Sequence, residues 1–257
     1  MGNPVSNTLM VWKALFLKDA LSRFFGNRAA WAWLIIEPAM HILVMVIMFT
    51  VIRTKKVGGV DVASWLMVGM LLFFLFRRTG VQSLHALDCN KAFFAFRQVR
   101  PFDAAISACL VELFSMGLVS VFISIVFAFI GYQVIPIDIL YLLAAVLGTW
   151  LLGLGYGLVS SVCMRIVRDS GHILQIIMAP LMFISGVILP VNNIPEPYRS
   201  YLLLNPLLHA IECARLSYWD TYHTLDVSLC YLYSVALVMI VVGMALYRAL
   251  ETRLVAQ

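Results

Sequence analysis

Few residues of this chain could do chemistry, because ionisable side chains are scarce in its long apolar runs. Glu37 and His41 interrupt the first run and, being four residues apart, share one face of a helix. Glu112 comes just before the third run. A charge inside a bilayer is costly to keep, so it marks a candidate functional site. For Glu37 the simpler role is structural: an ion pair with Arg23, with Arg28 or with a neighbouring helix.

The residue patterns that an intramembrane enzyme would need are missing. There is no HExxH for zinc, no pair of membrane aspartates, and Ser185 follows Phe183 where a serine-nucleophile turn has glycine. The five cysteines form no CxxC pair and fall at no metal-ligand spacing. No GxxxxGK[ST] phosphate loop occurs either. We therefore expect the chain to bind no metal and no cofactor, and to leave ATP and Mg²⁺ to a separate partner.

Composition places these polar residues in a bilayer. The 257 residues are 63% hydrophobic and 12% charged, with a mean hydropathy of +0.95, whereas soluble domains are about 45–50% apolar and about 25% charged. Six apolar runs lack the alternation of a barrel strand and predict transmembrane helices. They cover residues 29–52, 62–76, 113–135, 139–164, 173–189 and 227–247. We expect an all-α polytopic membrane protein with one transmembrane domain, residues 1–257.

The distribution of Lys and Arg orients these spans. With six spans both termini lie on one side, and placing them inside puts thirteen of the eighteen basic residues in cytoplasmic segments and five in outer ones. Both termini are thus predicted to be cytoplasmic. Residues 1–28 then form an amphipathic interface helix, and residues 77–103 form a cytoplasmic loop. The proline-rich outer segment, 190–226, predicts two short re-entrant helices before the last span.

Tryptophans and small residues mark two further features of the spans. Trp31 and Trp33 fall near a span end, where the interfacial aromatic belt lies, whereas Trp150 falls near mid-membrane. Belt or packing roles and stacking on sugar rings both remain open for them.

Small residues recur every four positions from Ala145 to Ser161, which predicts close helix packing, either within the chain or between two copies.

The predicted cytoplasmic loop combines aromatic with basic residues. This pattern fits either an amphipathic interface helix or a docking element for the groove of a partner. The residues concerned are Leu84, His85, Asp88, Phe93, Phe94, Arg97 and Arg100.

Three blocks of residues resemble the ABC-2 type exporter permeases. Arg23–Phe24 with the Trp33–Pro38 run resembles the start of the family's first span. The Leu204–His209 run with Arg215 resembles the signature before the last span, and Ser185–Gly186 with the Pro195–Tyr198 run resembles the outer loop. Within the family, Glu37 before Pro38 and the lack of a fused ATPase are most similar to permeases of capsular polysaccharide exporters, the KpsM type. The resemblance assigns no role to Arg77 and Arg78.

The resemblance implies a transport permease of the bacterial inner membrane that moves a lipid-linked polysaccharide from cytoplasm to periplasm. The implied partners are a second copy of the chain, two copies of an ABC ATPase subunit, a periplasmic co-polymerase and outer-membrane export proteins, without nucleic acid. Residues 84–100 would couple to the ATPase. The expected substrate pathway comprises Arg28, Trp31, Trp33, Glu37, His41 and Trp150. The expected periplasmic gate comprises Asn205, Pro206 and His209. The alternatives are an ABC-2 exporter of O-antigen, lipid or drug, and a passive channel or assembly scaffold that needs no ATPase.

Overall fold

The computed structural model describes residues 4–25, 30–52, 56–90, 93–94, 99–167, 170–224 and 226–250, and confirms an all-α membrane protein. The helices are α1 (Pro4–Phe25), α2 (Ala30–Ile52), α3 (Val62–Cys89), α4 (Pro101–Ile130), α5 (Ile139–Ile166), α6 (Ser170–Ile176), α7 (Met178–Ile184), α8 (Tyr198–Leu202), α9 (Pro206–Leu216) and α10 (Leu229–Ala249). A 3₁₀ turn, η2, covers Val191–Asn193. The strands β1 (Lys56–Val57) and β2 (Val60–Asp61) pair antiparallel, and positive φ angles at Gly58 and Gly59 allow the two-residue turn between them.

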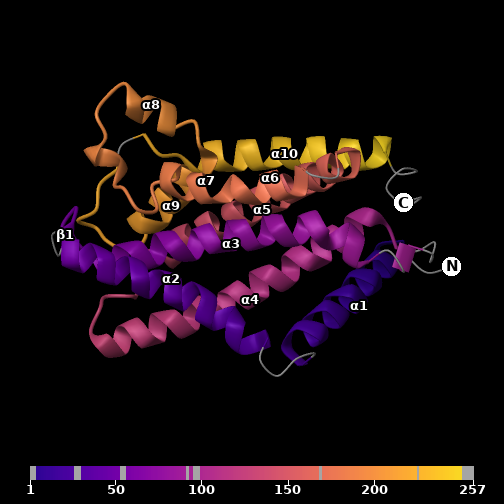
Figure 1. Cartoon of the computed structure of the whole chain (residues 1–257), viewed down its shortest axis with the longest axis horizontal. Coiled ribbons are helices and arrows are strands. Elements are labelled where there is room, and N and C mark those ends of the chain that lie inside the picture. Colours follow the sequence, from indigo (N-terminus) through magenta and orange to yellow (C-terminus); the bar gives the residue numbers. More distant parts are fainter. Residues whose placement is uncertain are drawn as a thin grey trace.

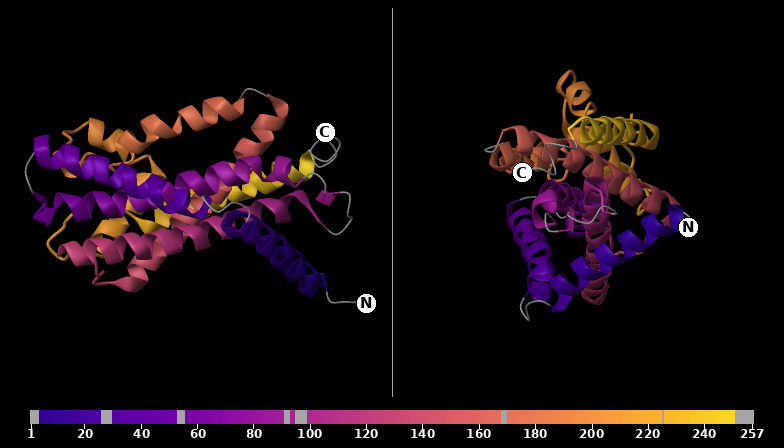
Figure 2. Two further views of the ribbon diagram at one scale, coloured as in Figure 1. Left: turned by 60° about the horizontal axis from the view of Figure 1, so that its bottom comes forward. Right: turned by 90° about the vertical axis from the view of Figure 1, so that its right-hand side faces the viewer.

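The long helices run side by side along the long axis of the molecule (Figure 1). Among the described residues, five helices are long and apolar enough to cross a membrane: α2, α3, α4, α5 and α10. α3 lies at the centre and contacts α2, α4, α5 and α9. α1 begins and α10 ends at the same end of the bundle, which we call the terminal end; the β hairpin, α8 and α9 lie at the opposite, distal end (Figures 1 and 2).

The predicted span 173–189 is not a single helix, because α6 and α7 divide it and end at Ile184. Pro180 is the third residue of α7 and has no N–H to donate to the carbonyl of Ile176, the last residue of α6. The chain therefore starts a new helix, in whose first turn N–H groups lack intrahelical partners anyway. Together α6 and α7 form an apolar stretch shorter than the five long helices, running back toward the distal end (Figure 2).

Two helices extend well beyond the apolar runs that predicted them. α3 continues through Arg77 and Arg78 to Cys89, and α4 begins at Pro101 rather than after Glu112. The predicted loop 77–103 is thus helical at both ends, since α3 continues to Cys89 and α4 begins at Pro101. An apolar run marks the part of a helix that lipid can surround, whereas the polar extensions of α3 and α4 are stabilised by pairing with other helices.

Small residues bring α5 close to α3. A Cβ atom on Gly157 would lie 2.6 Å from Oγ of Ser83 and 2.9 Å from the carbonyl oxygen of Gly80, so only glycine fits this contact. The other small residues of the stripe are also buried: Ala145, Thr149, Gly153 and Ser161. Gly148 and Gly155, on another face of α5, contact α10 in the same way. The predicted close packing is confirmed, and the stripe is used within the chain.

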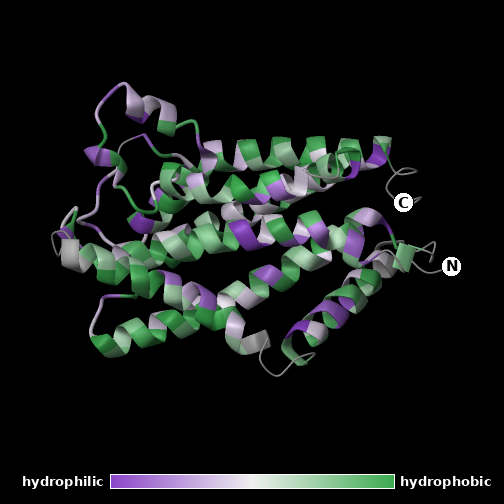
Figure 3. Cartoon of the chain, in the orientation of Figure 1, coloured by the Kyte–Doolittle hydropathy of each residue, from purple (hydrophilic) through white to green (hydrophobic). Residues whose placement is uncertain are grey.

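Polar residues gather at the two ends and along α1 and α8, whereas α4 and α10 are largely apolar (Figure 3). α1 lies at an angle to the bundle and packs on α4, exposing Leu9, Met10, Leu17 and Leu21 (Figure 2). Its location at a membrane surface stays a prediction. So does the re-entrant character of segment 190–226, in which α8 is exposed and α9 is buried against α3, α5 and α10.

Candidate functional site

A proline in α2 creates the first contact of the site. Pro38 has no N–H, so the carbonyl oxygen of Leu34, four residues earlier, loses its intrahelical partner. Arg78 of α3 donates to that oxygen from Nη2 at 3.4 Å, and the same nitrogen lies 2.7 Å from Oε2 of Glu37. One guanidinium therefore satisfies both the free carbonyl and the carboxylate next to it.

Arg77 lies on the other side of the same carboxylate and is held more loosely. Its Nη1 is 3.8 Å from Oε1 of Glu37, and its side chain is 41% exposed. Its guanidinium also lies 6.0 Å from the ring centre of Phe74. Arg77 can therefore exchange its partner at little cost, because an ion pair in contact with water contributes only about 0–1 kcal/mol.

A second buried carboxylate closes the site from the side of α4. Glu112 is fully buried, and its Oε1 forms an ion pair with Nη1 of Arg23, which lies on α1. Oε2 of Glu112 has no hydrogen-bond partner in the described part of the chain. A lone buried carboxylate is very costly, so Arg23 fixes α1 against α4 at this point.

These groups surround one cavity, which we call the arginine groove. It has a volume of about 310 Å³ and is lined by Arg23, Trp33, Leu34, Glu37, Arg77, Arg78, Val81, Gln82, Glu112, Gln175 and Met178. Its lining thus carries three guanidinium groups and two carboxylates, a surplus of one positive charge. A second cavity of about 480 Å³ shares Arg23, Leu34, Gln82 and Glu112, and extends the lining to Asn90 and to the paired Lys18 and Asp19. The arrangement is suited to binding an anionic group.

The residues expected to line a substrate pathway separate into two groups. Trp33, 65% exposed, and Glu37 line the arginine groove. His41 is one turn away, where its Nδ1 bonds the carbonyl oxygen of Glu37 at 2.8 Å and its ring packs on Phe74. Trp150 lies elsewhere, because its indole N–H donates to the carbonyl oxygen of Cys109 in α4 at 2.8 Å. Arg28 and the side chain of Trp31 lie outside the described residues.

The first three residues expected to meet an ATPase lie on the last turns of α3 rather than in a loop. Leu84 is buried and supports the bundle. His85 bonds Gln175 of α6 through Nε2 at 3.0 Å. Asp88 forms an ion pair with Arg165 of α5 at 2.9 Å. The terminal end of α3 is therefore fixed to two neighbouring helices.

The remaining residues of that set lie beyond α3. Phe93 and Phe94 form a half-buried 3₁₀ turn. The ammonium group of Lys18 in α1 lies 4.7 Å from the ring centre of Phe93. Phe94 packs on an apolar cluster of α3, α4 and α5. Arg100 is exposed directly before α4. Arg97 lies outside the described residues. The contacts with the ATPase thus stay a prediction.

The expected gate residues form the start of α9 and hold it in place. Asn205 caps the helix by accepting the N–H of Leu207 at 3.0 Å, and Pro206 fits the first helical position, where no N–H is needed. Nδ1 of His209 accepts the N–H of Ser228 at 3.0 Å, so Nε2 carries the proton and donates to the carbonyl oxygen of Leu203 at 2.7 Å. These side chains position α9, and their role as a gate stays a prediction.

Sequence reasoning missed a buried ion pair on α9. Arg215 and Glu212 are fully buried, with Nη1 of Arg215 2.7 Å from Oε1 of Glu212. The guanidinium lies 3.5 Å from the ring centre of Trp65 in α3. From sequence, Arg215 is a basic residue of the outer segment and part of the family signature. Glu212, three residues before it in a mostly apolar helix, is the signal that could have revealed the pair.

The same ion pair fixes the chain that follows α7. Arg215 also donates to the carbonyl oxygens of Gly186 at 2.7 Å and Val187 at 3.0 Å. The hydroxyl of Tyr222 donates to Oε2 of Glu212 at 2.8 Å, and burial raises the pKa of Tyr222, so the hydroxyl keeps its proton. Both Nη atoms of Arg215, both carboxylate oxygens of Glu212 and the hydroxyl of Tyr222 are thus bonded within the protein, so we assign the cluster a structural role.

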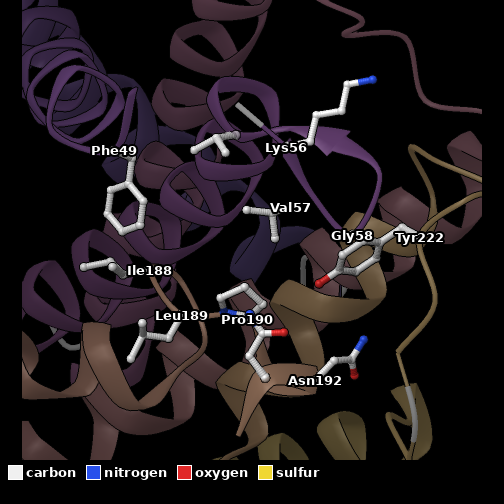
Figure 4. A pocket seen from close by; sticks show the side chains of 11 residues that line it. Phe49, Lys56, Val57, Gly58, Ile188, Leu189, Pro190, Asn192 and Tyr222 are labelled. Carbon is white, nitrogen blue, oxygen red and sulfur yellow. The ribbon is translucent and has the colours of Figure 1, made fainter. Parts of the chain in front are cut away.

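Beside this cluster lies a cavity of about 320 Å³ between the β hairpin and the segment after α7. Phe49, Ile188, Leu189 and Pro190 give it an apolar wall, and the ring of Tyr222 forms another side (Figure 4). Lys56 belongs to its lining, but its ammonium group points away from the cavity (Figure 4). This distal cavity lacks the convergent charges of the arginine groove.

Comparisons with known proteins agree with this architecture. Residues 11–219 match the family model "ABC-2 type transporter". The chain is 32% identical over 243 residues to the polysialic acid transport protein KpsM of Escherichia coli, covering 93% of each chain. It is 26% identical over 232 residues to the capsule polysaccharide export inner-membrane protein CtrC of Neisseria meningitidis, covering 90% of this chain and 88% of that one. It is 24% identical over 217 residues to the capsule polysaccharide export inner-membrane protein BexB of Haemophilus influenzae, covering 84% and 82%. The chain is thus a membrane permease rather than an enzyme, and it belongs to the ABC-2 type transporter family.

Proposed function

We propose that this chain is the transmembrane subunit of an ATP-driven exporter of capsular polysaccharide in the bacterial inner membrane. Three relatives that align over most of the chain carry names of capsule polysaccharide or polysialic acid transport, which supports this substrate class. An ABC ATPase subunit hydrolyses the ATP, because the permease has no phosphate loop. The polymer moves from cytoplasm to periplasm, and two copies of the chain form the pathway.

We propose further that the arginine groove receives the anionic part of the substrate. The observation that carries this proposal is the surplus positive charge of the groove together with the loosely paired Arg77. A guanidinium binds a carboxylate or a phosphate through two parallel hydrogen bonds, which suits an acidic sugar or a phosphate linkage to lipid. Arg78 keeps Glu37 in place, so Arg77 is the group that is released to the substrate.

α3 connects this groove to the residues expected to meet the ATPase. Arg78 and His85 lie about two turns apart on the same uninterrupted helix of 28 residues. Asp88 and Asn90 at its end are bonded to Arg165 and Lys18 of other helices. A displacement of this end by the ATPase is therefore transmitted along α3 and changes the contact of Arg77 with Glu37.

Both parts of the proposal are tested by measuring surface polysaccharide in a strain that lacks the gene for this chain. The strain is complemented with the chain and with the variants Arg77→Gln, Arg77→Lys and Lys13→Gln, at equal levels of permease in the membrane. Losing a charge-assisted contact of about 1.5–3 kcal/mol lowers export by about tenfold or more in Arg77→Gln. Arg77→Lys retains part of the activity. Lys13→Gln, which removes an exposed cation of α1 outside both cavities, exports normally.

The two parts fail in different ways. Normal export by Arg77→Gln would overturn the role of the groove and leave the capsule assignment standing. Unchanged surface polysaccharide in the deletion strain would overturn the substrate class. Purification of the permease without any ATPase subunit would favour a passive channel.

A further inference from the structure

A third cavity at the terminal end belongs neither to the arginine groove nor to its extension. It has a volume of about 620 Å³, lies between α1, α4 and α10, and shares no lining residue with the groove. Trp12 contributes from α1, Arg100 and Asp103 from the start of α4, and Met244 and Arg248 from the end of α10. We propose that this cavity binds the phosphate headgroup of an anionic membrane lipid.

The charges of this cavity favour a phosphate. Both oxygens of Asp103 are already occupied, Oδ1 by the indole N–H of Trp12 at 2.7 Å and Oδ2 by the backbone N–H of Arg100 at 2.9 Å. The guanidinium groups of Arg100 and Arg248 are exposed and form no ion pair within the part of the chain that the structure describes. The cavity lining thus carries two arginines and one carboxylate, Asp103, whose oxygens already accept from Trp12 and from the backbone of Arg100. A phosphodiester can accept hydrogen bonds from both.

The position of the cavity favours a lipid over a soluble phosphate. Arg100 directly precedes α4, and Arg248 is in the last turn of α10, so both lie where two long apolar helices end. Trp12 provides the aromatic side chain that is typical of the headgroup region. From the cavity toward its N-terminus, α10 exposes Met244, Val241 and Leu237 at spacings of three and four residues. This apolar strip offers a surface for an acyl chain, which a soluble phosphate does not need.

Native mass spectrometry of the purified permease–ATPase complex tests the proposal. The complex is released from nanodiscs that contain phosphatidylglycerol and phosphatidylcholine in equal amounts, and the retained lipids are counted. We expect the wild type to retain phosphatidylglycerol preferentially, and Arg248→Gln and Arg100→Gln to lower this preference by about tenfold each, the effect of one lost charge-assisted contact. The matched control, Lys13→Gln, keeps the wild-type preference. An unchanged preference in Arg248→Gln overturns the site.

Two further measurements separate the source of the phosphate and guard against misfolding. Excess glycerol phosphate leaves the lipid bound if the acyl chain contributes, whereas displacement of the lipid overturns its assignment in favour of a soluble phosphate. If the variants fail to assemble, wild-type protein is photo-cross-linked with diazirine-labelled phosphatidylglycerol. Cross-links at residues 237–248 of α10 support the site, and cross-links confined to other helices overturn it.

Discussion

Arg78 donates to the backbone carbonyl oxygen of Leu34, which Pro38 leaves without its helical partner. The Glu37–Pro38 step of α2 and the arginine pair of α3 therefore form one structural unit. The proline exposes an acceptor, the glutamate adds a negative charge beside it, and α3 supplies the donor for both. Arg78 thus joins α3 to α2 at this step, and Arg77 lies beside the same carboxylate.

Replacing Arg78 separates its structural role from that of Arg77. Arg78→Gln leaves the carbonyl oxygen of Leu34 and the carboxylate of Glu37 poorly satisfied, at a cost of about 1–3 kcal/mol. Arg77→Gln costs less than about 1 kcal/mol, because its pairing with Glu37 is long and exposed. Thermal unfolding of the purified permease measures both changes. Equal melting temperatures of the two variants would contradict the division of roles.

Removing the buried carboxylate of α4 should release α1. Glu112→Leu leaves the guanidinium of Arg23 without its partner, and breaking a buried ion pair costs about 3–5 kcal/mol, toward the lower limit here because Arg23 is partly exposed. Hydrogen–deuterium exchange in α1 should rise more than in α5. The double variant Arg23→Met with Glu112→Leu should restore most of the protection. An α1 that exchanges equally slowly in Glu112→Leu would show that other contacts hold it.

The contact between α5 and α3 should reject even one methyl group. Gly157→Ala places a Cβ against Ser83 and 2.9 Å from the carbonyl oxygen of Gly80, so overpacking should cost about 1–3 kcal/mol. Ser83→Gly in the same chain removes the nearest atoms and should restore part of the loss. Gly117→Ala in α4 is the matched control, because nothing lies within 4 Å of its new Cβ. Its stability should stay the same or rise by up to about 1 kcal/mol.

Arg215 should not tolerate lysine, although the charge is conserved. Lysine lacks the planar group that stacks on Trp65 and donates to Glu212 and to two carbonyl oxygens, so Arg215→Lys should lose on the order of 3 kcal/mol. Arg199→Gln, which breaks pairs with exposed carboxylates at the same end, should lose less than about 1 kcal/mol. Unfolding in a denaturant series compares the two. Similar midpoints would contradict a structural role for the buried pair.

Two exposed cysteines test the predicted orientation. Cys89 is at the terminal end of α3, and Cys230 is in the first turn of α10 at the distal end. In single-cysteine variants, a membrane-impermeant maleimide added to cells with a permeabilised outer membrane should label Cys230 and spare Cys89. The reverse pattern would place both termini in the periplasm.

The transmembrane helices could largely be predicted, because lipid selects for apolar composition wherever it contacts a helix. α2, α5 and α10 agree with their predicted runs to within about two residues at either end, a usual uncertainty of helix boundaries. α3 is different, because its apolar part is buried among other helices, and Arg77 and Arg78 lie beside the carboxylate of Glu37. Its polar extension therefore could not be recognised from hydropathy.

The candidate site was predicted only in part. Glu37 was identified because a carboxylate in an apolar run is costly, and its pairing with another helix was one of the alternatives. The partner itself, Arg78, is 41 residues away and follows from how α2 packs on α3, which no local pattern encodes. Trp150 was placed correctly on its helix, but its indole is bonded to the backbone of α4 rather than directed toward the groove.

The small residues of α5 lie on the face that packs against α3, and this limits how two copies of the chain could meet. Because the glycine-containing face is already covered by α3, a second copy would meet bulkier faces, such as those of α4 and α10 that expose Phe122, Phe129 and Val238. Bulky side chains keep helix axes farther apart than glycine does. A contact between two copies on these faces would therefore be looser than the contact between α5 and α3.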